Sequence, residues 1–453
     1  MCLAGETKTG GIKREQSSNT TACTAYFEEE TVSNPKLYEE ACWALKTAKA
    51  QGMIDAEKDT AVLFHSMNTH KSYLDHLKKD TQFSFHQNSN HAIAIKTNPH
   101  LGVLKQLVQW GFGLEAASME EVKLAVNAGC PTSKIVFDSP VKTRREIAIC
   151  HEKLPGMLLN VNCIEELERI PENPNFVLGL RINPLVDTKT EKIFHVSNNE
   201  SKFGTPIVEK NAILEAIRKY PITALHVHSG TAMVDLDCAV SAIKSVVNVA
   251  KDANKFLAAQ GLDRRITTID IGGGVRPEIL NSKHESRMQN YAAALKRNVP
   301  DLWTDFKMVT EFGQWSYFYS GFAASQVEYA LQRGETRIAY LHLGADFLMR
   351  DVYNRKPRGI DFIPAGEARN RHLVRTDIAG PLCFAGDYLD KQVMLPKLEE
   401  GDEVLLLNTG SNAYGLWSRH CSRSIPQMIG VDMQNESLNR LSERFNPFVD
   451  DMW

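Results

Sequence analysis

The sequence predicts an α/β protein with a (β/α)8 barrel, that is a TIM barrel, and a smaller C-terminal domain that is mostly antiparallel β-structure, a sandwich or a barrel. Three observations predict this fold. After Val62 short β-rich runs alternate with helical patterns, these runs are apolar on successive residues, and the alternation stops near Gly321. A chain of 453 residues is also long enough for one large domain and one smaller one.

Eight apolar runs form the predicted barrel strands. Parallel strands covered on both faces have this continuous apolar character, and eight βα units over about 230 residues are typical of a barrel. A doubly wound open sheet is the alternative that the pattern leaves open. The runs are AIAIK (92–96), FGLEA (112–116), KIVFD (134–138), GMLLN (156–160), FVLGLRI (176–182), TALHVH (223–228), TTIDI (267–271) and KMVTE (307–311).

Helices are predicted between these runs, because apolar residues recur there at three- and four-residue spacing. The clearest segments are LGVLKQLVQW (101–110), MEEVKLAVNAG (119–129), CIEELERI (163–170), AVSAIKSVVNVAKDANKFLAAQG (239–261) and SRMQNYAAALKRNV (286–299).

The C-terminal part shows β-like runs separated by Gly, Pro and Asp turns, with little helical periodicity. These runs are SQVEYAL (325–331), RIAYLHL (337–343), KQVMLP (391–396) and DEVLLLN (402–408), and the earlier run TAVLFH (60–65) is expected to join them. We therefore predict a flexible polar tail over 1–35, a segment over 36–66 that contributes to the β-domain, the barrel over 67–320 and the β-domain over 321–453.

Bulk composition limits the kinds of partner. Hydrophobic residues make up 43% of the chain, charged residues 24%, and the net charge is −3, so no basic footprint for nucleic acid or an anionic membrane is present. No uncharged run approaches the length that spans a bilayer. Nine cysteines without a CxxC pair or metal-like spacing predict neither disulfides nor a metal site. We expect a cytoplasmic protein that acts on a small molecule.

Polar residues at the ends of the predicted strands indicate where the chemistry lies, since barrel active sites are built at the C-terminal ends of the strands. A lysine amine can form a Schiff base with an aldehyde cofactor, and burial would lower its pKa. Glycines let backbone amides approach a phosphate, and a glutamate can keep a pyridine nitrogen protonated. The residues are Lys96, Glu115, Asp138, His228, Gly272, Gly273, Gly274 and Glu311. Taken singly, each also fits a solvated strand end, a plain turn or a core histidine.

Eight motifs then carry a resemblance that spans about residues 60–440. They are IAIKTN (93–98), LEAASMEE (114–121), SKFG (201–204), LHVHSGT (225–231), DIGGG (270–274), EFGQ (311–314), GPLCFAGD (380–387) and NAYG (412–415). Together they resemble the alanine-racemase-like (fold-type III) pyridoxal phosphate enzymes, and specifically the diaminopimelate and ornithine decarboxylase group.

The resemblance implies a pyridoxal phosphate-dependent amino-acid decarboxylase, a homodimer with shared active sites, in which Cys383 enters the partner subunit's site to protonate the product. It implies that the cofactor is held by Lys96, Glu115, His228, Thr231, Gly272, Gly273, Gly274, Glu311, Gln314 and Tyr414. Lys96, Cys383 and His228 would be catalytic, and Arg350, Phe384 and Asp387 would contact the substrate.

Two departures from the family pattern bear on the substrate. Gln314 stands where an arginine usually assists phosphate binding, which removes a fixed positive charge. Phe384 stands where diaminopimelate decarboxylases carry a glutamate for the distal amino group, and it does not reproduce the Cys-Asp pair of ornithine decarboxylases either. We therefore expect a substrate other than diaminopimelate. A racemase or epimerase, and a catalytically silent relative with a regulatory role, are the alternatives.

Overall fold

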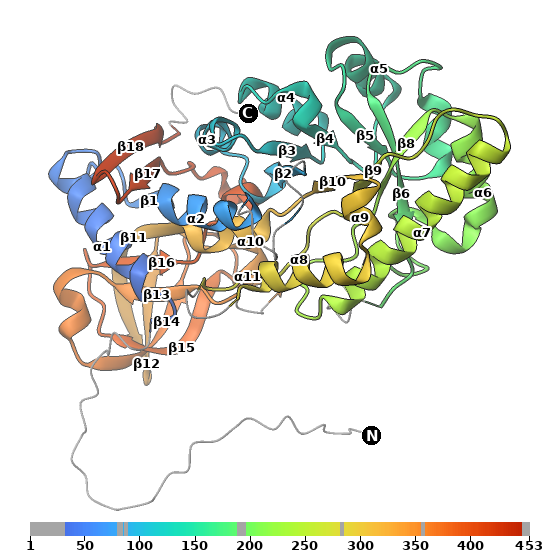
Figure 1. Ribbon diagram of the computed structural model, residues 1–453. Helices are drawn as coiled ribbons and strands as arrows, with labels where there is room; N and C mark the ends of the chain where they lie inside the picture. The colour runs from blue at the N-terminus through green and yellow to red at the C-terminus, as the bar shows by residue number, and fades with distance from the viewer. Residues whose placement is uncertain are drawn as a thin grey trace, which may run out of the picture.

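The computed structural model describes residues 32–78, 85, 89–187, 196–280, 285–354 and 358–445. Two lobes lie side by side, a barrel drawn from cyan to yellow and a β-domain drawn mainly in orange and red (Figure 1). The blue N-terminal elements lie in the β-domain lobe, so both ends of the described chain contribute to it. Most of the predicted polar tail, residues 1–31, lies outside the described residues.

Eight parallel strands close into a ring, as the sequence predicts. Their order is β2-β3-β4-β5-β6-β8-β9-β10, and the pairings β5–β6 and β10–β2 close the circle, which excludes the open sheet. A short strand, β7 (Thr205–Pro206), adds to the edge of β6. The ring strands are β2 (Asn90–Ala94), β3 (Gly113–Ala116), β4 (Ile135–Phe137), β5 (Leu158–Val161), β6 (Val177–Asn183), β8 (Ile222–His226), β9 (Thr268–Asp270) and β10 (Lys307–Thr310).

Helices cover the outside of the ring, and polar side chains set where several of them begin. Ser118 caps one helix, and Thr143 and Ser286 each form a capping box that satisfies free backbone amides. The predicted helix CIEELERI is instead the 3-10 turn η4 (Ile164–Arg169). The helices are α2 (Met67–Lys78), α3 (Leu101–Gln109), α4 (Met119–Asn127), α5 (Arg144–Lys153), α6 (Lys210–Lys219), α7 (Asp237–Ala259), α8 (Arg287–Asn298), α9 (Asp301–Thr304) and α10 (Gln314–Tyr317).

The second sheet is mostly antiparallel, as predicted, and runs in the order β15-β14-β12-β11-β1-β17-β18, with β16 joining β11 to β13. Strand β1 (Ala61–Ser66) pairs with β11 and β17, so the run TAVLFH does lie in this sheet. Within this second sheet, β1–β17 and β12–β14 are the parallel pairs among the described strands, and the other pairs are antiparallel. The other strands are β11 (Gly321–Arg333), β12 (Thr336–Leu341), β13 (Asp361–Pro364), β14 (Leu373–Ala379), β15 (Tyr388–Pro396), β16 (Glu403–Leu407), β17 (Met428–Asp432) and β18 (Ser437–Ser442).

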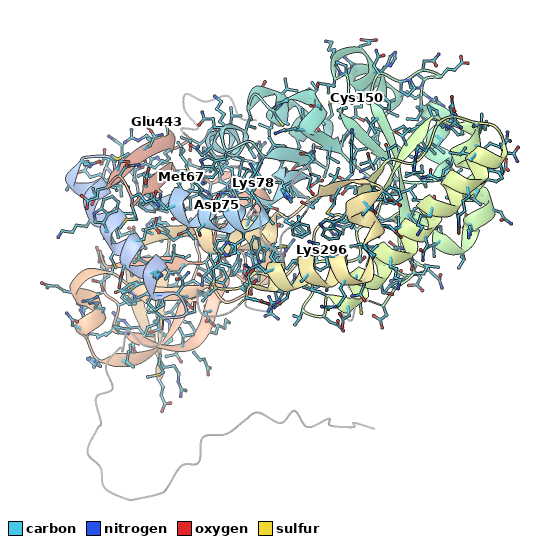
Figure 2. All side chains as sticks on the ribbon, in the orientation of Figure 1. Met67, Asp75, Lys78, Cys150, Lys296 and Glu443 are labelled. Atoms are coloured by element: carbon cyan, nitrogen blue, oxygen red, sulfur yellow. The ribbon has the colours of Figure 1, made fainter. Side chains whose placement is uncertain are left out.

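Helix α1 (Pro35–Ala50) covers the β-domain sheet, and helix α2 connects the β-domain to the barrel. Helix α1 packs its buried face, which includes Leu37 and Leu45, on the β-domain. Helix α2 carries Asp75 and Lys78 (Figure 2). Lys78 Nζ lies 4.0 Å from the centre of the Phe112 ring and donates to the Trp110 carbonyl, which ties the end of α2 to the barrel.

Glu40 gives the fold a pH dependence that can be measured. Its carboxyl group is buried on α1, and burial raises its pKa from 4.5 to about 7, although hydrogen bonds from Ser66 and Thr69 oppose the rise. The folded chain therefore keeps a proton that the unfolded chain releases, so the contribution of Glu40 to stability is largest in acid. We expect the free energy of unfolding to fall by about 3 kcal/mol between about pH 4.5 and about pH 7 because of this group.

Urea unfolding of Glu40→Gln at about pH 5 and about pH 8 checks this expectation, because the variant should lose that part of the pH dependence. Glu39→Gln, one residue away and exposed, is the matched control and should retain it. A Glu40→Gln protein with the wild-type pH slope would contradict the prediction.

Candidate active site

Lys96 lies at the mouth of the barrel, in the 3-10 turn η2 (Ile95–Thr97) that follows β2. Its Nζ is 2.7 Å from Glu115 Oε1 and 2.6 Å from Oε2, so the amine is held by the end of the neighbouring strand β3. The Glu115 side chain is fully buried, whereas 49% of the Lys96 side chain is accessible. The amine therefore stands at the boundary between a buried acidic floor and solvent.

The pKa of Lys96 is shifted in the opposite direction to the one that the sequence suggested. Burial alone would lower this pKa, but the carboxyl groups of Glu115, Asp138 and Glu311 together raise it above its ordinary value. The expectation of a lowered lysine pKa is therefore wrong for the protein alone, because it considered burial without the carboxylates. The amine must give up a proton before it can act as a nucleophile.

A layer of buried charges lies beneath Lys96. Glu115, Asp138, Asp270 and Glu311 are all buried, and Arg181 on β6 is the buried cation among them. Burial lowers the pKa of Arg181, while the neighbouring carboxylates act in the opposite direction. Its guanidinium lies 4.4 Å from the centre of the Phe203 ring, in the predicted SKFG motif. Sequence reasoning missed Arg181; its only signal was a charged residue inside the apolar run FVLGLRI.

His226, for which the sequence favours a structural role, lies at the centre of this layer. Its Nδ1 is 3.1 Å from Asp270 Oδ2 and 3.7 Å from Glu311 Oε1, and its Nε2 is 3.7 Å from Asp138 Oδ2. The nitrogen and oxygen atoms of Asp138, His226 and Glu311 lie close enough together to ligate a metal ion. We do not assign one, since Lys96 and Arg181 already supply positive charge to the same carboxylates.

His228 and the glycine loop form one unit at the mouth. The Gly273 amide donates to His228 Nδ1 at 3.2 Å, which fixes the orientation of the ring. Burial, and then the charges of Arg181 and Lys96, lower the pKa of His228 to about 3, so the imidazole is neutral. A neutral ring held in this way is suited to stacking on a flat cofactor.

The three glycines are required by close packing. A Cβ on Gly272 would lie 2.7 Å from the Val227 carbonyl oxygen, and one on Gly274 would lie 1.9 Å from that of Gly230. Two of the three amides already have acceptors, because Gly272 N donates to Asp270 Oδ1 and Gly273 N donates to His228. The loop thus brings backbone close to the mouth, but it offers fewer free amides to a phosphate than the sequence suggested.

We expect Gly273→Ala to weaken cofactor binding at least about tenfold and to destabilise the fold by about 1–3 kcal/mol, because overpacking forces neighbouring groups apart. Its Cβ would stand 2.3 Å from the Glu311 carbonyl oxygen. Fluorescence titration with pyridoxal phosphate and thermal unfolding measure the two effects. Gly102→Ala, whose Cβ meets nothing closer than 3.3 Å, is the control, and equal behaviour of the two variants would refute the argument.

Glu311 and Gln314 present unpartnered polar atoms at the site. Glu311 Oε1 and Gln314 Oε1 are buried and have no hydrogen-bond partner. Burial, with the nearby carboxylates of Asp270 and Asp138, raises the pKa of Glu311 well above its ordinary value. A cofactor that brings a ring nitrogen beside Glu311 would satisfy this group, so the residues fit pyridoxal phosphate.

The β-domain brings Tyr414 to the Lys96 turn. Tyr414 lies in η9 (Tyr414–Leu416), just after Asn412, whose amide donates to the Thr97 carbonyl at 2.9 Å. The Tyr414 ring centre is 5.3 Å from that of His100, and burial raises the pKa of its hydroxyl. Thr231 is half-buried in the loop after β8. Both lobes therefore contribute to the site.

The four remaining predicted residues lie together on the β-domain. Cys383 is exposed, and the Phe384 ring stacks on Tyr353, with centres 5.1 Å apart and planes 13° apart. Arg350 is on α11 (Met349–Asn354), the helix that carries Tyr353. Asp387 accepts the amides of Ala345 and Leu382 at 2.6 and 2.7 Å, so its visible role is to hold the loop, and a substrate contact by Asp387 stays a prediction.

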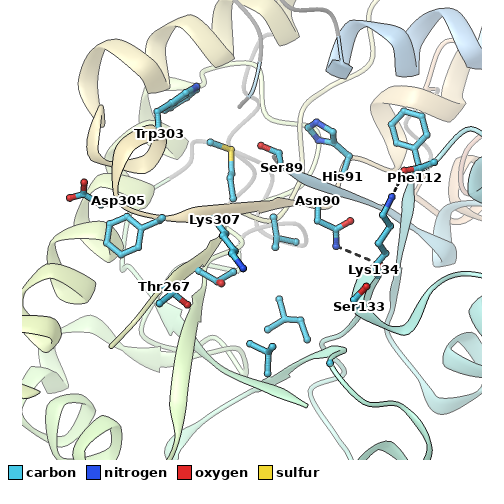
Figure 3. Close-up of a pocket in the computed structure, with 18 of the residues that line it drawn as sticks. Ser89, Asn90, His91, Phe112, Ser133, Lys134, Thr267, Trp303, Asp305 and Lys307 are labelled. Carbon is cyan, nitrogen blue, oxygen red and sulfur yellow. Dashed lines mark hydrogen bonds between the residues drawn. The ribbon is translucent and has the colours of Figure 1, made fainter. Parts of the chain in front are cut away.

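A large cavity of about 770 Å³ lies at the other end of the barrel (Figure 3). Its lining includes the starts of several strands, with Asn90, Lys134 and Lys307 labelled in the view. Lys134 Nζ donates to the Gly111 carbonyl there. This cavity lies at the N-terminal ends of the barrel strands, whereas Lys96 and Glu311 lie at their C-terminal ends. The size of a cavity alone therefore does not identify the active site.

Comparison with known proteins gives the family. Residues 74–316, more than half of the chain, match the family model described as pyridoxal-dependent decarboxylase, pyridoxal binding domain. The chain belongs to the pyridoxal-dependent decarboxylases. The family confirms the predicted cofactor, pyridoxal phosphate, and the predicted reaction class, decarboxylation of an amino acid.

Several relatives share most of the length of this decarboxylase. The diaminopimelate decarboxylase of Helicobacter pylori strain J99 is 28% identical over 375 residues, which is 80% of this chain and 87% of the relative. The L-glutamyl-[BtrI acyl-carrier protein] decarboxylase of Niallia circulans is 26% identical over 347 residues, covering 72% and 78%. These two relatives, which are similarly identical to this chain, are named for different substrates.

Solved structures support the fold of the decarboxylase. The H. pylori diaminopimelate decarboxylase complexed with L-lysine matches with a TM-score of 0.73 at 24% identity, covering 85% of this chain and 94% of that one. The arginine decarboxylase of Paramecium bursaria Chlorella virus matches with a TM-score of 0.72 at 18% identity, covering 86% and 99%. In the part of the chain that the structure describes, no helix has the length and apolar character to cross a bilayer.

Proposed function

We propose that this decarboxylase removes the α-carboxyl group of an amino acid at the barrel mouth, with the cofactor attached to Lys96. The observation that carries the proposal is the position of the Lys96 amine, which is accessible, held by Glu115 and surrounded by His228 and Glu311. When bound, pyridoxal phosphate supplies an electron sink for the charge that remains after carbon dioxide leaves.

The roles of the surrounding residues follow from their states. Neutral His228 would lie against the cofactor ring, since the Gly273 amide already fixes its Nδ1. Glu311 would hold a proton at the ring nitrogen, and its unpartnered Oε1 is free to do so. Gly272, Gly273 and Gly274, with Thr231, Gln314 and Tyr414, would surround the phosphate.

Gln314 makes one difference to this phosphate site. It offers an amide donor but no positive charge, so cofactor affinity must come from several neutral donors. Gln314 Oε1 is buried, and no group of the described residues donates a hydrogen bond to it.

The substrate would be read by the β-domain loop of a partner subunit in a homodimer. Cys383 is exposed and would return a proton to the product, and Arg350 would bind a substrate carboxylate. The Phe384 ring, stacked on Tyr353, offers an apolar surface and, unlike a glutamate, cannot form an ion pair with an ammonium group. This favours a substrate with a less polar distal end than diaminopimelate.

Incubation in deuterated water with a panel of L- and D-amino acids, read by mass spectrometry, tests the function. An amine that lacks the carboxyl group and carries one new deuterium would support decarboxylation and name the substrate. An unchanged amino acid with deuterium at the α-carbon would instead support a racemase. Diaminopimelate as the best substrate would refute the substrate proposal while leaving the reaction intact.

Mixing two inactive variants tests the shared site. We expect Lys96→Ala and Cys383→Ala each to be inactive alone and their mixture to recover about a quarter of wild-type activity, because random pairing gives half heterodimers with one intact site each. Cys421→Ala, the change of another exposed cysteine, is the control and should be fully active alone. A Cys383→Ala protein with the normal rate would remove this residue from the mechanism.

A further inference from the structure

Glu115 and Asp138 lie on neighbouring strands of the barrel with their side chains on the same face. Glu115 pairs with Val136 in the β3–β4 register, and Asp138 follows Val136 by two residues. The Asp138 amide donates to the Ala116 carbonyl at 3.1 Å, which continues the ladder past the end of β4. The register therefore brings two carboxyl groups together below the Lys96 amine.

Both carboxyl groups are buried, and the Lys96 amine lies 2.6 Å from Glu115 Oε2. Carboxylates are acceptors only, so a hydrogen bond between two of them requires a proton on one. Two like charges in contact at a buried site cannot both persist without a large cost. The strand register and the burial together therefore favour one proton on this pair.

The charge balance of the site agrees. Four buried carboxyl groups face two fixed cations, Lys96 and Arg181, because a third buried cation, Lys142, is paired with Glu166. His228 is neutral. Burial and the Asp138 charge raise the pKa of Glu115 well above its ordinary value, whereas Lys96 and Glu115 hold the pKa of Asp138 low. One pKa is raised and the other is lowered, which is the behaviour of two coupled carboxyl groups that hold one proton between them.

We propose that Glu115 and Asp138 share one proton and exchange a second one with Lys96 Nζ, so that the pair is the proton store of the active site. The proposal rests on the proposed function of Lys96. When Lys96 becomes a nucleophile, an N–H bond of its ammonium group breaks and an O–H bond forms on the pair. When the amine is released again, the same proton returns to nitrogen, so no proton is exchanged with solvent.

Other charged groups face the pair and set its environment. Lys96 on η2 touches Glu115, and Asp138 interacts with Arg181 on β6 and His226 on β8. Glu311 after β10, Glu121 on α4 and Lys142 before α5 also interact with one or both members electrostatically. Asp138→Asn is the informative change, because the amide can still donate to Glu115 but cannot store a proton.

Infrared difference spectroscopy of the purified full-length protein near neutral pH counts protonated carboxyl groups. We expect one such group fewer in Asp138→Asn and in Glu115→Gln than in the wild type. Glu120→Gln, an exposed change five residues from Glu115, is the control and should show the wild-type count. Wild-type counts in both pair variants would overturn the proposal.

The pH profile of cofactor attachment is the second readout. Because the pair accepts the lysine proton internally, the ratio of the wild-type attachment rate to the Asp138→Asn rate should fall by about tenfold per pH unit as the pH rises. A merely structural change would lower the rate equally at every pH, and that result would overturn the proposal. Failure of every protein to attach pyridoxal phosphate would instead overturn the proposed function, while the infrared count would still decide the state of the pair.

Discussion

Lys96→Ala should abolish covalent attachment of pyridoxal phosphate and lower the decarboxylation rate by at least about a thousandfold, equivalent to about 4 kcal/mol of transition-state stabilisation. Lys96 is the amine at the mouth, with Glu115 at 2.6 Å and the buried carboxylates beneath it. The variant removes the amine nitrogen that we propose bonds to the cofactor aldehyde.

Borohydride reduction followed by peptide mass spectrometry measures attachment directly. Lys105→Ala, an exposed change on α3, is the control and should retain both the adduct at Lys96 and the activity. A reduced adduct at the wild-type level in Lys96→Ala would show that another lysine carries the cofactor. Loss of the adduct with retained activity would refute the mechanism.

Lys142→Met should destabilise the fold by about 3–5 kcal/mol, the cost of removing one member of a buried ion pair. Lys142 is fully buried, and its Nζ donates to the carbonyl oxygens of Ser139 at 2.6 Å and Asn160 at 2.8 Å, with Glu166 Oε1 at 3.1 Å. It therefore ties the ends of β4 and β5 to η4 at the same face of the barrel as Asp138. Methionine is of similar length, so the effect reports the lost charge and its hydrogen bonds rather than a cavity.

Urea unfolding measures this effect. Lys210→Met is the matched control, because Lys210 pairs with Asp252 on the surface, where 48% and 39% of the two side chains are accessible. The control should cost less than about 1 kcal/mol. Adding Glu166→Gln to Lys142→Met should recover part of the lost stability, since it removes the unpaired buried charge. A Lys142→Met protein as stable as the control variant would contradict the prediction.

The barrel, and the fact that several candidate site residues lie together, could be predicted because both depend on local patterns and one general rule. Eight apolar runs predicted eight strands, and the rule that barrel sites lie at strand ends predicted that Lys96, Glu115, His228 and Glu311 would meet. Motifs predicted the contribution of Tyr414, and the structure places it beside the Lys96 turn. The roles of these residues toward cofactor and substrate stay predictions.

Several β-domain features could not be predicted in this way. Strands β13, β14, β17 and β18 were not predicted. The pairings of β13 with β16, of β14 with β12 and of β17 with β1 connect residues far apart in the sequence, whereas β18 pairs with its chain neighbour β17. Asp387 was expected at the substrate, yet the structure uses its carboxylate to hold the loop through two backbone amides. A motif gives the position of a residue in the chain but not which donors surround it after folding.

The sequence by itself determined the fold class, the family motifs and the lysine that the site is built around, because apolar periodicity and motif order are properties of the chain. Only the tertiary structure decided the electrostatics. It placed Arg181 and His226 among four carboxylates, raised the pKa of Lys96 and set Glu115 and Asp138 on the same face of neighbouring strands. The physical reason is that these effects depend on strand register and burial, and neither the distance between two charges nor their exposure to water is written in the order of the residues.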